Sequence, residues 1–145
     1  MSEKEINSIS SSEWVVMRII WSLEKPTTNE IIKAVKNKKD WSESTIKTLL
    51  SRLVKKNLLS TNKVSRQFIY QPEVEESEAM NSSALSLFDN MCAMKNGQVI
   101  SNIINNTEIS KSDLKEIKSL IDSKLDSAPE MVKCDCINSN ECSHN

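Results

Sequence analysis

The carboxyl-terminal segment of the chain gathers side chains that bind soft metal ions. Three of the four cysteines and the single histidine fall within residues 134–144, in the pattern C-x-C, five residues, C-x-H. Thiolates and imidazole suit tetrahedral Zn²⁺, and thiolates also suit Cu(I). A short loop can fold back so that the two pairs of donors converge on one ion. The spacing therefore predicts a site for Zn(II) or Cu(I), with the ligands Cys134, Cys136, Cys142 and His144.

The same cluster has two simpler interpretations. The thiols could be incidental in an unstructured tail, or they could form a disulfide. No export signal opens the sequence, so we expect a cytoplasmic protein in a reducing compartment, where disulfides are rare. Clustering this dense rarely arises by chance, which favours metal binding. Cys92 lies among apolar residues of a predicted helix, and we expect it in the core rather than at the metal.

The sequence offers little for catalysis or for membrane insertion. A chain with one glycine cannot form a glycine-rich phosphate loop, and His144 has no scaffold around it. No spaced carboxylate pair marks a pocket for general acid–base chemistry. No apolar run approaches the ~20 residues of a membrane span. We therefore expect neither enzyme activity nor a membrane partner.

Charge is distributed unevenly along the 145 residues. Residues 1–72 contain 13 basic and 7 acidic side chains, a net charge of +6. Residues 73–145 contain 6 basic and 13 acidic side chains, a net charge of −7. A basic half favours a polyanionic partner, although many basic segments are merely solvated.

One predicted helix of the basic half has the composition of a DNA-reading element. After an N-cap at Ser42, apolar residues recur at i, i+3, i+4, i+7 and i+8 from Ile46 to Val54. The opposite face and a following basic hairpin carry hydroxyls, lysine and arginine, which can contact base edges and phosphates. A solvated helix face is the simpler alternative. The predicted DNA-binding residues are Ser44, Thr45, Lys47, Thr48, Arg52, Lys63 and Arg66.

Two further helices are predicted before this one. Ser10 and Glu13 have the spacing of a capping box and mark the start of the first helix, which Pro26 ends. Thr27 and Glu30 repeat the spacing and start the second helix. Apolar residues at helical intervals follow each cap, so both helices are expected to bury one face.

A change of period follows the third helix, which we expect to end at Asn57 in the left-handed conformation. The pattern then predicts a strand over residues 58–61, a turn over 62–65 and a strand over 66–70. Three helices and a basic hairpin predict a winged helix-turn-helix domain, within a fold that is mainly α with a small β-hairpin.

The acidic half is predicted to be helical. A long helix over residues 73–94, a break at Gly97, a short helix over 98–105 and a last helix capped by Ser110 carry more apolar surface than they can cover among themselves. Pairing with a second copy of the chain would bury that surface, so we expect a homodimer. The predicted parts are a winged-helix DNA-binding domain (1–72), a helical dimerisation region (73–128) and a metal-binding tail (129–145).

Four motifs of the first half carry a family resemblance. They are EWxxMxxIW from Glu13, TNEI from Thr28, WSxSTIKTLLxRLVKK from Trp41 and RxFxY from Arg66. Together they resemble the winged-helix repressors of the penicillinase-repressor (BlaI/MecI) family, tightly over the first half and loosely beyond it. The cysteine tail is similar to that of the copper-responsive, CopY-type branch of this family.

The resemblance implies a homodimer that binds palindromic operator DNA. In that branch the zinc form represses copper-transport genes, and Cu(I) displaces zinc and releases the DNA. A copper chaperone that delivers Cu(I) would be a further partner. The resemblance assigns the recognition helix and the wing to the residues chosen above from the polar face, namely Ser44, Thr45, Lys47, Thr48, Arg52 and Arg66.

This chain departs from the branch in its last ligands and in two turns. The branch usually ends C-x-C, four residues, C-x-C, whereas here the gap is five and His144 replaces the last cysteine. Asn57 and Ser65 stand where the family often has glycine. Two alternatives remain: a β-lactam-responsive repressor inactivated by proteolysis near Asn102-Ile103, and a metal-buffering protein without an operator.

Overall fold

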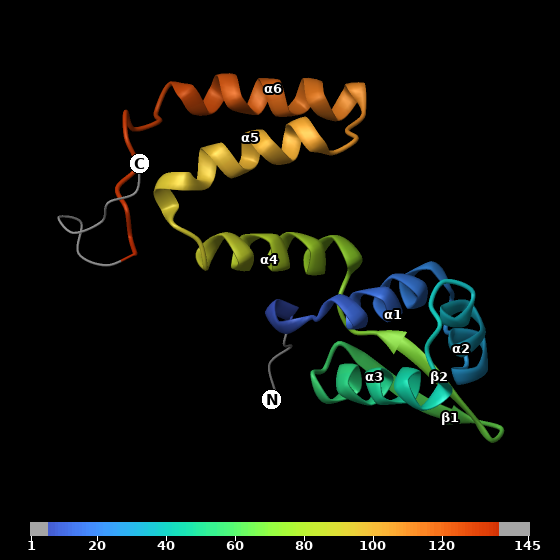
Figure 1. Ribbon diagram of the computed structural model, residues 1–145. Coiled ribbons are helices and arrows are strands. Elements are labelled where there is room, and N and C mark those ends of the chain that lie inside the picture. Colours follow the sequence, from blue (N-terminus) through green and yellow to red (C-terminus); the bar gives the residue numbers. More distant parts are fainter. Residues whose placement is uncertain (1–5, 137–145) are drawn as a thin grey trace. The chain divides into compact units, whose positions relative to one another are not determined.

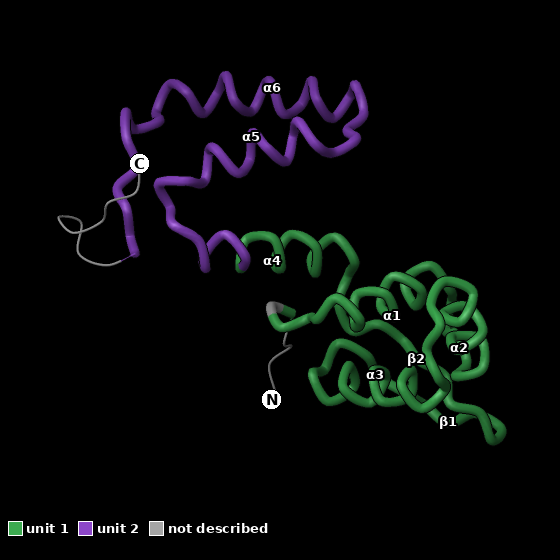
Figure 2. The backbone as a smooth tube through the Cα atoms, in the orientation of Figure 1, with its two compact units in different colours: residues 1–86 green, residues 87–145 purple. Residues whose placement is uncertain are grey.

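The computed structural model describes residues 6–136. The chain forms two compact units, residues 1–86 and residues 87–145 (Figure 2). In chain order the elements of the first unit (Figure 1) are η1 (Ile6–Ser8), α1 (Ser11–Ser22), α2 (Thr28–Lys36), α3 (Glu43–Lys55), β1 (Leu59–Val64), β2 (Gln67–Pro72) and α4 (Glu76–Asp89), which continues into the second unit. The second unit adds η2 (Ala93–Lys95), α5 (Asn96–Asn106) and α6 (Lys111–Leu125). The predicted division into three functional parts stays a prediction, because compactness does not assign function.

The first three long helices begin at the caps that the sequence predicts. Ser10 Oγ accepts from the Glu13 backbone amide at 3.2 Å, and Ser42 Oγ accepts from that of Thr45 at 3.2 Å. Thr27 and Glu30 form a complete capping box, each side chain accepting from the other's backbone amide. Each cap satisfies an amide that the helix cannot pair, and such a cap stabilises a helix by about 1 kcal/mol.

One hydrophobic core unites the three helices, the hairpin and the start of α4. Its fully buried side chains come from α1 (Val16, Met17, Ile20), α2 (Ile31, Val35), α3 (Ile46, Leu53), the turn after it (Leu58) and α4 (Ala79). The hairpin is tied to the segment before α2, because the Tyr70 amide donates to the Pro26 carbonyl at 2.9 Å and Thr27 forms a bridge with Ile69. The predicted winged-helix fold is confirmed.

The hairpin turn lies two residues later than predicted. β1 extends through Val64, which pairs with Gln67, so the loop consists of Ser65 and Arg66 alone. Their φ angles are 48° and 72°, the left-handed values that a two-residue turn of the type I′ class needs at both positions. The predicted turn over residues 62–65 was wrong because no glycine marks the true one.

The ends of the helices also follow left-handed residues. Asn57 has φ 61° and lies just after α3, as predicted. α1 ends at Ser22, earlier than Pro26 alone would require, and Lys25 has φ 45° immediately before that proline. A residue that precedes proline is kept out of the helical region, so the chain leaves the helix before the proline ring.

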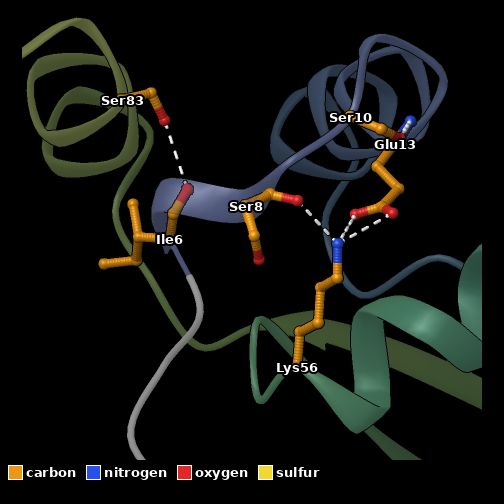
Figure 3. A network of polar contacts seen from close by, with 6 residues as sticks. All are labelled: Ile6, Ser8, Ser10, Glu13, Lys56 and Ser83. Atoms are coloured by element: carbon orange, nitrogen blue, oxygen red, sulfur yellow. Dashed lines mark hydrogen bonds and ion pairs between the residues drawn. The ribbon is translucent and has the colours of Figure 1, made fainter. Parts of the chain in front are cut away.

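A buried ion pair joins the start of α1 to the end of α3 (Figure 3). The Glu13 side chain is only 3% exposed, and its carboxylate oxygens accept from Lys56 Nζ at 2.8 and 2.9 Å. The same ammonium group donates to the Ser8 carbonyl at 2.7 Å. Lys56 caps α3 and is therefore a structural residue rather than part of the exposed polar face.

Two hydrogen bonds attach α4 to the rest of the first unit. Trp21 Nε1 donates to the Val74 carbonyl at 3.0 Å, just before α4 begins. Ser83 Oγ, within α4, donates to the Ile6 carbonyl at 3.3 Å (Figure 3). The chain that leaves the wing is thus held at two points to the amino-terminal part of the unit.

The predicted long helix over residues 73–94 is interrupted. α4 ends at Asp89, and the amides of Asn90 and Met91 donate to the carbonyls three residues earlier, which tightens and closes the last turn. Gly97 does not mark the break, because it lies inside the first turn of α5. α6 starts where predicted, with Ser110 Oγ accepting from the Asp113 amide at 3.1 Å.

The helices of the second unit leave apolar side chains uncovered. No residue of α5 or α6 is buried. The large apolar side chains exposed on these two helices are Ile100, Ile103, Leu114, Leu120, Ile121 and Leu125. Within residues 6–136 no helix has both the length and the apolar character needed to cross a membrane.

Removing the ammonium partner of Glu13 should destabilise the fold. Lys56→Ala leaves a buried carboxylate without its cation, so we expect the free energy of unfolding to fall by about 3 kcal/mol. Urea unfolding of this variant and of the exposed neighbour Lys55→Ala measures the difference. The control should stay within about 0.5 kcal/mol of the unmodified chain. Equal effects at the two positions would contradict the role given to the pair.

Glycine at the wing turn should stabilise the protein. Ser65→Gly removes the cost of a left-handed side-chain-bearing residue, and we expect a gain of about 1 kcal/mol in the free energy of unfolding. The matched control is Ser60→Gly within β1, where the same replacement should cost about 0.5–1 kcal/mol. A loss of stability in both variants would show that the turn conformation is not the one described.

Candidate functional site

The polar face of α3 is exposed as the sequence predicts. Its apolar side chains Ile46, Leu49, Leu50 and Leu53 point into the core. The opposite side chains are all exposed, namely Ser44, Thr45, Lys47, Thr48 and Arg52. Since the buried stripe fixes the rotation of the helix, these five residues are presented to solvent together.

Hydroxyl groups at the start of α3 are linked to one another. Ser42 Oγ lies 3.1 Å from Ser44 Oγ and 2.9 Å from Thr45 Oγ1. Thr48 Oγ1 donates to the Ser44 carbonyl at 2.8 Å. The hydroxyl proton of Thr48 is therefore engaged by the helix backbone, and its methyl group and an oxygen lone pair face outward. Such a surface can contact a thymine methyl or accept from a base amino group.

An open groove of about 440 Å³ lies between α2, α3 and the wing. Lys47 and Ser51 contribute to it from α3, and the start of α2 contributes Thr28 and Asn29. The wing contributes Arg66, Gln67, Phe68 and Tyr70. Sequence analysis did not assign Thr28, Asn29, Ser51 or Gln67 to this surface, because only the fold brings α2 and β2 beside α3.

The wing presents its two predicted basic residues differently. Lys63, on β1, places its Nζ 5.9 Å from the centroid of the Phe68 ring. A cation–π contact of this kind contributes about 0.5–1 kcal/mol at an exposed site. Arg66 occupies the turn itself and borders the groove.

The four basic side chains of this face keep their charge available. In the described part of the chain, Lys47, Arg52, Lys63 and Arg66 form no ion pair with a carboxylate. All four are exposed. The face formed by α3 and the wing is therefore a positively charged surface with hydroxyl groups at its centre, suited to a phosphate backbone and base edges.

Three cysteines of the second unit form a thiol cluster, defined here as Cys92, Cys134 and Cys136. Their sulfur atoms all lie within 4.8 Å of one another. Cys92 Sγ is 3.5 Å from Cys134 Sγ, and the Cys136 amide donates to Cys134 Sγ at 3.5 Å. The structure thus brings together two of the four predicted ligands, while Cys142 and His144 lie outside the described residues.

Cys92 was expected in the hydrophobic core, and that interpretation was wrong. It lies in the segment between α4 and α5, as the residue before η2, and its side chain is half-buried outside the core cluster. The prediction failed because it assumed an uninterrupted helix through residue 94. The end of α4 at Asp89 turns the Cys92 thiol toward the tail.

The residue between the two tail cysteines fastens the cluster. Asp135 Oδ1 accepts from the Ala93 backbone amide at 2.9 Å. A hydrogen bond with Cys92 raises the pKa of the Cys136 thiol above its usual value, with smaller contributions from desolvation and from the charges of Cys92 and Asp135. Without a cation nearby, this thiol keeps its proton, and metal binding would release it.

The donor set fits a soft metal ion. Sulfur atoms bound at 2.3 Å to a tetrahedral zinc ion lie about 3.8 Å apart. The separations in the thiol cluster, from 3.5 Å up to at most 4.8 Å, bracket that value. Thiolates are also the preferred ligands of Cu(I). The cluster can therefore hold Zn²⁺ or Cu(I) after small side-chain adjustments.

Comparison with known proteins places the whole helical framework in one family. The profile of the family described as penicillinase repressor matches residues 9–123. The chain belongs to the penicillinase repressor family. The resemblance seen in the four sequence motifs is confirmed, and the match ends before the tail cysteines. The family is one of DNA-binding repressors rather than enzymes.

Relatives of this chain share most of its length. An uncharacterised 16.5 kDa protein of Latilactobacillus sakei is 45% identical over 136 residues, covering 94% of this chain and 92% of that protein. The penicillinase repressor of Bacillus licheniformis is 31% identical and covers 82% of this chain and 93% of its own length. The methicillin resistance regulatory protein MecI of Staphylococcus aureus is 31% identical, with coverages of 80% and 94%.

Solved structures of related repressors match about half of the chain. The DNA-binding domain of the repressor BlaI is 43% identical and covers 52% of this chain and 92% of that domain, with a TM-score of 0.48. Monomeric Bacillus licheniformis BlaI, solved with the blaP half-operator, has the same identity and coverage and a TM-score of 0.47. A CopR repressor structure is 47% identical over 47% of this chain and 99% of that chain, with a TM-score of 0.41. Family membership rests on the longer sequence matches.

Proposed function

We propose that this protein is a metal-responsive transcriptional repressor of copper-transport genes. It binds a palindromic operator as a homodimer in the cytoplasm, represses in its zinc form and leaves the DNA when Cu(I) is bound. The observation that carries the proposal is the thiol cluster of a repressor-family chain, a donor set suited to both metals.

The DNA-binding role is supported by the exposed face of α3. Ser44, Thr45 and Thr48 are short enough to approach base edges, and Arg52 can bond guanine bidentately. Lys47 on α3, with Lys63 and Arg66 on the wing, can neutralise phosphates. An α-helix fits the major groove, so α3 would read bases while the wing contacts the backbone.

The homodimer is supported by the second unit. The apolar side chains of α5 and α6 are exposed within one chain, and association of two copies would bury them. A two-fold dimer presents two copies of α3 to successive major grooves, about 34 Å apart. The operator should therefore be a short palindrome.

The metal would be held by the soft donors of the tail. Cys134 and Cys136 lie together, and Cys142 and His144 are the further ligands predicted from the sequence. When bound, zinc or Cu(I) supplies a cross-link between these donors. His144 favours zinc over Cu(I), so the two metals would be held by different subsets of the tail. Cys136 is exposed, which would allow a copper chaperone to deliver Cu(I) by thiolate exchange.

A second candidate is a β-lactam-responsive repressor that is inactivated by proteolysis. It is favoured by the names of the relatives, a penicillinase repressor and MecI. The corresponding bond, Asn102-Ile103, lies inside α5, so cleavage would require local unfolding of that helix. Truncation after Lys133 separates the two functions, because only the metal-responsive repressor needs the tail.

Substitutions on α3 should separate base reading from phosphate binding. Arg52→Ala should weaken binding to a duplex of the gene's own upstream DNA by about 1–3 kcal/mol and less on unrelated DNA. Lys47→Ala should weaken binding to all duplexes and reduce the slope of log affinity against log salt by about 0.9 for each phosphate that is no longer neutralised. Fluorescence anisotropy at several salt concentrations measures both effects.

The control for these variants is Arg18→Ala, an exposed arginine on α1 that lies outside the polar face of α3. It should bind DNA as the unmodified protein does. If it weakens binding as much as the α3 variants do, α3 is not the reading element.

Loss of the two tail cysteines should make the repressor insensitive to copper. Cys134→Ser with Cys136→Ser removes half of the predicted ligands, so the operator complex should persist when Cu(I) is added. The unmodified protein should release the same duplex under the same conditions. Copper-dependent release by the double variant would show that the tail is not the sensor.

A further inference from the structure

We infer that Cys92 is a direct ligand of the metal site and supplies the fourth thiolate that the tail lacks. The inference rests on the metal-binding function proposed above and specifies how the site is built. It places one ligand on the segment between α4 and α5, in addition to those after α6.

The position of Cys92 is fixed by the local backbone. α4 ends at Asp89, and Cys92 precedes η2 with φ −61° and ψ 122°. From there its sulfur reaches 3.5 Å from Cys134 Sγ and within 4.8 Å of Cys136 Sγ. Cys92 and the tail cysteines all belong to the second unit. No apolar packing accounts for a thiol in this place, because Cys92 does not belong to the hydrophobic core cluster.

An independent contact holds the tail beside Cys92. Asp135 Oδ1 accepts from the amide of Ala93, the residue that follows Cys92. Two neighbouring residues of the junction, Cys92 and Ala93, thus meet two neighbouring residues of the tail, Cys134 and Asp135. The tail is aligned with the junction by a carboxylate as well as by sulfur, so the approach of the three thiols does not depend on one side chain.

The ligand count gives Cys92 a chemical role. The tail contains three cysteines and His144, and the chain contains four cysteines in all. With Cys92 the site can use four thiolates, which complete a tetrahedral zinc site without imidazole. The same set is entirely sulfur, as Cu(I) prefers. The histidine in the last position of the tail therefore need not limit copper binding.

A ligand in the junction also gives the metal a mechanical role. A metal held only by residues after α6 would cross-link a terminal segment to itself and would not distinguish two arrangements of the helices. A ligand shifts a conformational equilibrium only through its different affinity for the two states. Cys92 lies between α4, which follows the wing, and α5, which carries exposed apolar side chains, so metal bound to Cys92 can bias that connection.

The test uses the full chain under reducing conditions, with Co²⁺ as a spectroscopic probe of the zinc site. Cys92→Ser should reduce the sulfur-to-cobalt charge-transfer absorbance to about three quarters and weaken zinc binding by at least about tenfold. The matched control is Asn90→Ser, an exposed change in the same junction that adds the same side chain without removing a sulfur. The control should bind both metals as the unmodified protein does.

A second measurement needs no variant and is independent of folding defects. Zn²⁺ should slow the alkylation of Cys92 by N-ethylmaleimide at least as much as it slows that of Cys134 and Cys136, as read by peptide mass spectrometry. Protection of the tail cysteines alone, with Cys92 alkylated at its metal-free rate, would overturn this inference and leave the proposed function intact. Protection of no cysteine would overturn both.

His144→Gln distinguishes the two ligand sets. With Cys92 in the site, the histidine variant should keep the charge-transfer absorbance and the zinc affinity of the unmodified protein. Loss of zinc binding in His144→Gln together with an unchanged Cys92→Ser would show that the tail alone forms the site.

Discussion

The orientation of α3 is the constraint on which the DNA-binding surface depends. Four apolar side chains at helical spacing enter the core, and their burial leaves one face of hydroxyl and basic groups in solvent. The Glu13–Lys56 ion pair then holds the end of this helix to the start of α1. Because both interactions act on the same helix, its rotation and its position are fixed together, and the wing meets it across a groove lined by Lys47 and Arg66.

The second unit follows the opposite principle. α5 and α6 bury no residue of their own, so their stability must come from a surface that a single chain does not supply. Next to them, the thiol cluster connects the junction before α5 to the segment after α6. A helical pair that needs a partner and a metal site that ties both of its ends together form a physical basis for switching, since a small change in coordination acts on a weakly self-supported element.

Local rules predicted much of the first unit. Capping residues located the starts of α1, α2, α3 and α6, because a cap is a contact between residues three positions apart. The hairpin turn was misplaced, since neither Ser65 nor Arg66 has the usual preference for left-handed angles. Cys92 was misread for a different reason: its neighbours in sequence are apolar, and its partners lie 42 positions away. Contacts of that range depend on where helices end, and no short motif records the end of α4.

The account joins these two units through a single claim, that soft donors of the second unit control the occupancy of the operator by the first. The most direct measurement is the affinity of one preparation of the unmodified protein for a duplex of its gene's upstream DNA, first with zinc and then with stoichiometric Cu(I). The account predicts tight binding with zinc and release with Cu(I). Equal affinity in the zinc, copper and metal-free forms would contradict it.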